Sequence, residues 1–170
     1  MYKCVWFVFT FLFIKTIFIR FLSCFIFALY FDAQIMTFYW FADGASRQTR
    51  NLASAAWVIY SPTDKLIISG GRCLGHATNN VAEYQATIGL ITEALSNGIS
   101  QLIVHLDSQL IVSQLNRIYS IRDLTLLRLF RRVRLLEISF IYIHFCYILR
   151  RFNIVSDSLA NFMLDWYLSH

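Results

Sequence analysis

Three strand-like stretches follow one another on short connections, and they constrain the fold more than any other feature of this chain. Residues 37–42, 53–60 and 65–74 are β-prone, and turn-forming residues separate them. The third stretch contains Gly70-Gly71, which predicts a bulge or a bend. Consecutive strands on short connections form an antiparallel meander. We therefore expect a sheet that begins with three antiparallel strands.

Helical and strand-like segments alternate in the rest of the chain. A long helix is predicted up to Gly98, because apolar residues recur at three- and four-residue steps after a cap at Thr78 or Asn79. The later elements are a strand over 101–106, a helix over 108–116, a helix capped by Asp123, a strand over 138–148 and a helix over 153–166. The order βββ-α-β-α-α-β-α predicts an α/β fold, with a five-stranded mixed sheet flanked by helices.

Four acidic residues stand at boundaries between these predicted elements. The first strand is expected to end at Asp43 and the fourth at Asp107, with Glu83 in the first turn of the long helix and Asp157 in the first turns of the last one. Clustered carboxylates repel one another, and hard divalent cations such as Mg²⁺ remove that cost by taking oxygen ligands. We therefore predict a metal site at one edge of the sheet.

Sequence motifs around these four acids closely resemble those of type 1 ribonuclease H. They are FADGAS at residues 41–46, TNNVAEY at 78–84, LDSQLIV at 106–112 and RRFNIVSD at 150–157. The last is similar to the family's R-x-x-N-x-x-A-D, with serine in place of alanine. The resemblance extends from about Phe41 to Leu168, and its details look like the ribonuclease H of plant gypsy-class retroelements. Four motifs in the family's order and spacing are a specific signature.

The resemblance implies hydrolysis of the RNA strand of an RNA–DNA hybrid by two divalent ions, Mg²⁺ or Mn²⁺. It assigns metal-binding and catalytic roles to Asp43, Glu83, Asp107 and Asp157. It also implies substrate contacts by four further residues: Thr78, Asn79 and Asn80 in the minor groove, and Gln109. A monomer located in the cytoplasm or nucleus is expected on the same basis.

The chain departs from the family pattern at several positions. Residues 48–51 replace a Gly- and Pro-containing turn, and the loss of its glycines predicts strain beside Asp43. Tyr147 stands where the family has a histidine that assists turnover, and a phenol does not replace imidazole proton chemistry near neutral pH. Arg117 stands where relatives often have glycine. These changes suggest an ageing retroelement copy, and a binding domain with little turnover is the alternative to an active enzyme.

The first 35 residues differ in composition from the rest, and we treat residues 36–170 as the ribonuclease H-like domain. Eleven of the 16 Phe fall within the first 41 residues, and residues 4–31 are almost continuously apolar. A signal anchor, an uncleaved targeting segment and an upstream extension through non-coding DNA are three open interpretations; the richness in Phe favours the third. The first interpretation would give a membrane-anchored protein that contacts the bilayer through residues 4–31.

The remaining charged and sulfur-containing residues are less specific. The formal net charge of +5 suits a polyanionic partner without requiring one. Four arginines at positions 128, 131, 132 and 134 are predicted on a solvated helix face, in preference to a hybrid-binding surface. The four Cys show no metal-binding or disulfide spacing, which indicates a reduced compartment.

Overall fold

The computed structural model describes residues 38–47, 52–61, 63 and 65–169. Our predictions about the apolar segment 1–35 and about strain in the loop 48–51 fall outside these residues. Within the described part of the chain, none of the helices combines the length and apolar character needed to cross a bilayer.

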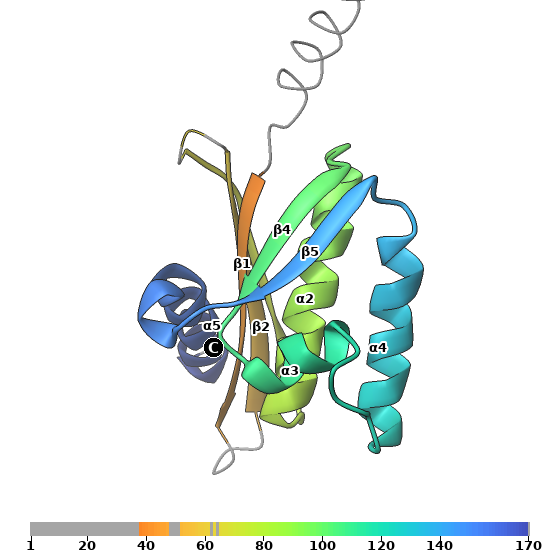
Figure 1. The fold of residues 1–170 in the computed structure, drawn as a ribbon. Coiled ribbons are helices and arrows are strands. Elements are labelled where there is room, and N and C mark those ends of the chain that lie inside the picture. Colours follow the sequence, from red (N-terminus) through yellow and green to blue (C-terminus); the bar gives the residue numbers. More distant parts are fainter. Residues whose placement is uncertain (1–37, 48–51, 62, 64, 170) are drawn as a thin grey trace, which may run out of the picture. The chain divides into compact units, whose positions relative to one another are not determined.

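A five-stranded mixed sheet forms the centre of the fold, as predicted (Figure 1). Its strands are β1 (Phe38–Arg47), β2 (Leu52–Tyr60), β3 (Leu66–Gly75), β4 (Gln101–Leu106) and β5 (Tyr142–Tyr147). In space they follow the order β3-β2-β1-β4-β5. The first three strands are antiparallel, whereas β4 is parallel to both β1 and β5. The end of β4 at Leu106 therefore lies beside Ala42 of β1.

Helices cover both faces of the sheet. They are α2 (Asn79–Ser96), α3 (Gln109–Leu115), α4 (Leu124–Glu137) and α5 (Ile154–Ser169). In β2 the Trp57 ring packs against Gly89 of α2, whereas the Ser54 hydroxyl donates to Ala160 O of α5 at 2.6 Å. Residues three apart on a strand point to opposite faces. Helices α2 and α5 therefore lie on opposite sides of the sheet, with α4 packed outside α2 (Figure 1).

Hydrogen-bonding side chains start three of the helices. Thr78, Ser108 and Asp123 accept backbone N–H bonds at the starts of α2, α3 and α4. The predicted caps at Thr78 and Asp123 are confirmed, whereas Ser108, predicted as the first residue of its helix, is the residue that caps α3. The closing helix starts at Ile154 and continues to Ser169, three residues beyond our prediction.

Strand β1 is longer than predicted. It does not end at Asp43, because Gly44 to Arg47 continue to pair with β2. The pairing between β1 and β4, by contrast, stops at Ala42 and Leu106. Asp43 therefore stands where β1 separates from β4 but remains bonded to β2. Strand β5 is shorter than predicted and starts at Tyr142, because the chain after α4 is first taken up by turns.

The Gly70-Gly71 pair is not a bulge. Both glycines pair in regular register with Trp57 and Ala56, and the irregularities between β2 and β3 lie elsewhere. A Cβ at position 70 would approach the Trp57 ring to 2.6 Å, and one at Gly89 of α2 would approach it to 2.3 Å. Gly70 and Gly89 thus make room for the buried indole of Trp57 between a strand and a helix.

Candidate active site

Three carboxylates converge where β1 and β4 separate. Asp43 belongs to β1, Asp107 directly follows β4, and Glu83 comes from α2. One oxygen from each lies within 4.8 Å of the other two. Asp43 and Glu83 are buried, and Asp107 is half-buried. Glu83 is the fifth residue of α2 and so lies in its second turn, which corrects our prediction of the first turn.

Gly44 brings β1 against the backbone of α2. A Cβ at this position would approach Glu83 N to 2.2 Å, closer than real Cβ contacts permit. The Gly44 N–H donates a hydrogen bond to the Glu83 carboxylate. The other oxygen, Glu83 Oε2, is buried without a hydrogen-bond partner within the described residues. A buried, unsatisfied anionic oxygen beside two further carboxylates suits a hard divalent cation.

Burial and the repulsion of neighbouring carboxylates raise the pKa of two of the acids, Asp43 and Glu83. Burial, followed by the charges of Asp107 and Asp157, raises the pKa of Asp43 to about 7. Burial and the charges of Asp43 and Asp107 raise the pKa of Glu83 well above its usual range. Such a site is costly in its fully ionised state unless positive charge is supplied.

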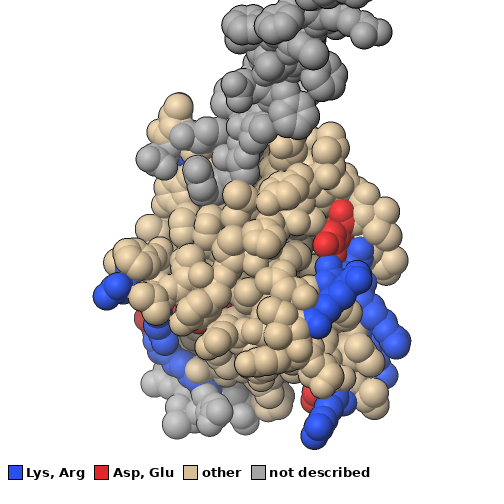
Figure 2. Space-filling view, in the orientation of Figure 1, with Lys and Arg blue, Asp and Glu red and all other residues tan. Residues whose placement is uncertain are grey.

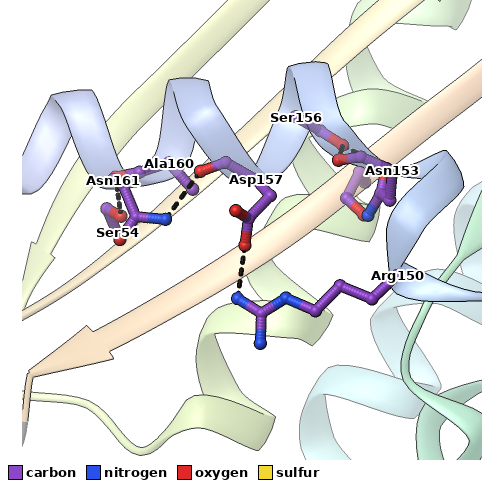
Figure 3. A network of polar contacts seen from close by, with 8 residues as sticks. Ser54, Arg150, Asn153, Ser156, Asp157, Ala160 and Asn161 are labelled. Carbon is purple, nitrogen blue, oxygen red and sulfur yellow. Dashed lines mark hydrogen bonds and ion pairs between the residues drawn. The ribbon is translucent and has the colours of Figure 1, made fainter.

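Asp157 lies next to this group but pairs with a cation of the chain itself. Its Oδ1 accepts from Arg150 Nη2 at 2.5 Å (Figure 3), while it also shares a side-chain hydrogen bond with Asp43. Arg150 and the other three acids line one pocket of about 360 Å³. The guanidinium lowers the pKa of both Asp43 and Glu83, although burial outweighs that effect.

A buried amide fixes the start of α5 next to β1. Asn153 is 1% exposed, and its Nδ2 donates to Ala42 O at 3.0 Å. Its Oδ1 accepts from the Ser156 hydroxyl, and Figure 3 shows these two side chains turned toward each other. Asn161 Nδ2 donates to Asp157 O one turn further along. This network holds Asp157 at the edge of the site.

One of the four predicted substrate contacts shares a pocket with the acids, and the other three do not line it. Asn79 lines the same pocket as the acids. Thr78 is exposed and caps α2, Asn80 is half-buried, and Gln109 is exposed at the start of α3. These last three do not line the acidic pocket. Their role toward a substrate stays a prediction.

Arg150 and Asn153 both stand in the fourth motif, but its spacing alone predicted no role for either side chain. The position of Asn153, four residues before Asp157, can be read from the sequence. The hydrogen-bond partner of its side chain cannot, because Ala42 lies 111 positions away. Tyr147 ends β5 opposite Leu106, the residue before Asp107. The position of the missing family histidine is therefore one strand away from the acids.

A second, apolar cavity of about 490 Å³ lies beside the start of α5. Phe41, Tyr60, His105 and Phe152 are among its lining residues. The Phe41 ring stacks on His105 with a centroid separation of 5.1 Å. Burial lowers the pKa of His105. The cavity is larger than the acidic pocket, but none of its lining residues is a carboxylate, so the acidic pocket is the better candidate for chemistry.

Comparisons with known proteins agree with this geometry. A family model described as Reverse transcriptase-like matches residues 41–163. Ribonuclease HI of Halobacterium salinarum is 36% identical over 123 residues, which cover 72% of this chain and 62% of that protein. A bifunctional protein of Mycobacterium tuberculosis is 30% identical over 125 residues, which cover 73% of this chain and 34% of that protein. The chain thus spans less than two thirds of these curated relatives.

Solved structures share the fold. The crystal structure of RNase H1 from Halobacterium salinarum matches with a TM-score of 0.73 and 34% identity, covering 76% of this chain and 98% of that one. LC11-RNase H1, crystallised in complex with an RNA/DNA hybrid, matches with a TM-score of 0.73 and 26% identity, covering 77% and 99%.

Proposed function

Because this chain belongs to the Reverse transcriptase-like family and to the type 1 ribonucleases H, we propose that it hydrolyses the RNA strand of RNA–DNA hybrids. The observation that carries the proposal is the convergence of Asp43, Glu83 and Asp107 within 4.8 Å around an unpartnered, buried Glu83 oxygen. A relative with the same fold has been crystallised with such a hybrid.

The acids would hold the metal in this activity. Asp43, Glu83 and Asp107 would bind Mg²⁺ or Mn²⁺, and Asp157 would join Asp43 at a second position. Bound divalent ions supply an activated water and stabilise the leaving oxygen of a phosphodiester. Ionisation of Asp43 and Glu83 would accompany binding, because cations lower the pKa values that burial has raised.

Residues around the acids would orient the hybrid. Thr78, Asn79 and Asn80 stand at the start of α2, where backbone N–H groups and amide side chains can meet the 2′-hydroxyls of the minor groove. Gln109 would contact the nucleic acid from the start of α3. We further propose that the protein acts as a monomer, derives from a retroelement and works in the cytoplasm or nucleus. A membrane location would follow if residues 4–31 anchor it.

Cleavage of a labelled RNA–DNA hybrid by the full chain tests the proposal, first in Mg²⁺ and then in Mn²⁺. We expect cleavage of the RNA strand alone. Asp107→Asn preserves the size of the side chain but removes a carboxylate, and it should lower the rate at least about 100-fold, because several kcal/mol of charge stabilisation depend on the metal. Cleavage that persists in this variant would come from a contaminating nuclease.

The alternative is a hybrid-binding domain with little turnover, and Tyr147 is the feature that favours it. A folded, metal-binding preparation that fails to cleave would reject the active-enzyme proposal. Tyr147→His then becomes the decisive variant, since a restored general acid–base group should raise turnover about tenfold or more. Absence of both cleavage and hybrid binding would reject the two functions together.

A further inference from the structure

The outer face of α4 carries an unusual concentration of arginine. Arg128, Arg131 and Arg132 are all exposed, and their i, i+3, i+4 spacing puts them on one side of the helix. Figure 2 shows Lys and Arg gathered over the position of α4 in Figure 1. Within the described part of the chain, none of the three forms a salt bridge.

The fourth arginine of this helix serves the fold. Arg134 is half-buried, donates to Leu115 O and Glu137, and lies 5.0 Å from the centre of the Phe130 ring. Its contacts tie α4 to α3. The contrast separates one structural arginine from three that have no acidic partner among the described residues.

Arg72 of β3 extends the same positive surface. Its Nη2 donates to Gln85 Oε1 of α2 at 2.7 Å, and the positive charge of Arg132 reaches it strongly enough to lower its pKa, after the larger effect of burial. Gln85 stands two residues after Glu83. The arginine face, which we define as Arg72, Arg128, Arg131 and Arg132, is therefore attached to the helix that supplies one of the site carboxylates.

A merely solvated helix face would be built differently. Like charges at i, i+3 and i, i+4 destabilise a helix by a few tenths of a kcal/mol per pair, and acids normally alternate with bases to avoid this. Arginine, rather than lysine, supplies all four positions, and its planar fork of donors matches phosphate oxygens. A nucleic-acid duplex offers closely spaced phosphates along both strands.

We propose that the arginine face binds the phosphate backbone of the hybrid away from the cleaved bond. The inference rests on the proposed function for the identity of the duplex. It replaces our prediction of a plain solvated face. Its contribution is to affinity and salt dependence, because these side chains do not reach the acidic pocket.

The test compares two charge-matched double variants of the full chain. R131Q/R132Q removes two charges from the arginine face, whereas K65Q/R151Q removes two exposed charges outside it. Fluorescence anisotropy of a labelled hybrid in EDTA, at a series of salt concentrations, measures binding without cleavage. The slope of log K against log salt should fall by about 2 in magnitude for R131Q/R132Q, at about 0.9 for each lost phosphate contact. The control should retain the parental slope.

Kinetics in Mg²⁺ provide the second readout. R131Q/R132Q should raise KM several-fold and leave kcat unchanged, as expected for contacts made equally in the ground and transition states. R131K/R132K keeps the charge and guards against misfolding of the glutamine variant; it should recover most of the slope. Circular dichroism melting confirms that each variant is folded.

The outcomes separate this inference from the proposed function. Equal salt slopes for the two glutamine variants, with cleavage intact, would show that the arginine face does not bind the hybrid. The proposed nuclease activity would be unaffected by that result. A reduced slope specific to R131Q/R132Q without cleavage by any preparation would support the face and overturn the nuclease. A parental protein that does not bind hybrid would overturn both.

Discussion

The Asn153 side chain and the Ala42 carbonyl join the start of α5 to β1 through a 3.0 Å hydrogen bond. This bond is fully buried and lies one residue before Asp43. It therefore connects the placement of Asp157, which follows Asn153 by one helical turn, to the placement of the central acid.

Asn153→Ala should destabilise the protein by roughly 1–3 kcal/mol, because it leaves the buried Ala42 carbonyl without its amide donor and removes one of the two acceptors of the Ser156 hydroxyl. Urea denaturation at constant m-value measures the loss. Ser156→Ala is the matched control and should cost less than about 1 kcal/mol, since Ala42 keeps its donor. Equal losses for the two variants would show that the bond to Ala42 carries no special weight.

The raised pKa of Asp43 makes the stability of the metal-free protein depend on pH. Its unfolded pKa is near 3.8 and its folded pKa about 7, so protonated Asp43 contributes fully below pH 4 and this contribution is lost as the pH rises to 7. Asp43→Asn removes the ionisation. In EDTA the variant should therefore gain stability relative to the parent between pH 4 and 7. The gain should be at most roughly 4 kcal/mol, because a difference of one between the folded and unfolded pKa corresponds to about 1.36 kcal/mol.

The same pair of proteins distinguishes repulsion from a general effect of the substitution. Saturating Mg²⁺ should stabilise the parent at pH 8 and stabilise Asp43→Asn much less, because ligand binding to the folded state shifts the unfolding equilibrium. A stability difference between them that stays constant from pH 4 to 8 would mean that Asp43 is already ionised throughout this range.

Arg117 has a φ of 61°, in the left-handed region where a side chain is strained. Arg117→Gly should raise the free energy of unfolding by up to about 1 kcal/mol, because the strain of 1–2 kcal/mol exceeds the entropy cost of glycine. Arg117→Ala keeps the Cβ and should bring no such gain. Thermal melts of the three proteins compare them directly, and a gain in the alanine variant as large as in the glycine variant would point to charge instead.

Gly89→Ala should destabilise the protein by about 1–3 kcal/mol, although alanine is the better helix former by about 1 kcal/mol. The new Cβ would lie 2.3 Å from the Trp57 ring. The double variant Gly89→Ala/Trp57→Phe provides the control, since a smaller ring should make the alanine less harmful. Additive losses in the double-mutant cycle would contradict the proposed steric contact.

Local patterns in the sequence predicted most of the fold. The caps at Thr78 and Asp123 and the apolar steps of α2 are short-range features, and they predicted where two helices begin and which residues of α2 are apolar. The four motifs likewise predicted the acids of the site, three of which the structure brings together. The fold class follows because the element order permits few topologies.

Long-range contacts explain what the sequence could not predict. The length of β1 depends on how far β2 follows it, and no local pattern in residues 44–47 records that partner. The Gly70-Gly71 pair indicated backbone freedom, whereas Gly70 makes space for the Trp57 ring and Gly71 lies against Ala55 O and Met163. The Arg150–Asp157 pair was equally hidden, because motif spacing names residues without giving the rotamers that bring them together.

The close approach of Gly44 to α2 has a consequence for how this site can change over time. Gly44, which follows Asp43, lies directly against the backbone of Ala82 and Glu83. The distance between Asp43 and Glu83 is therefore set by a contact between main chains. Residues such as Arg117 and Tyr147 do not belong to that contact, so changes at their positions leave it intact. A copy free of selection would lose speed and affinity first, and the distance between these two carboxylates would be among the last features to drift.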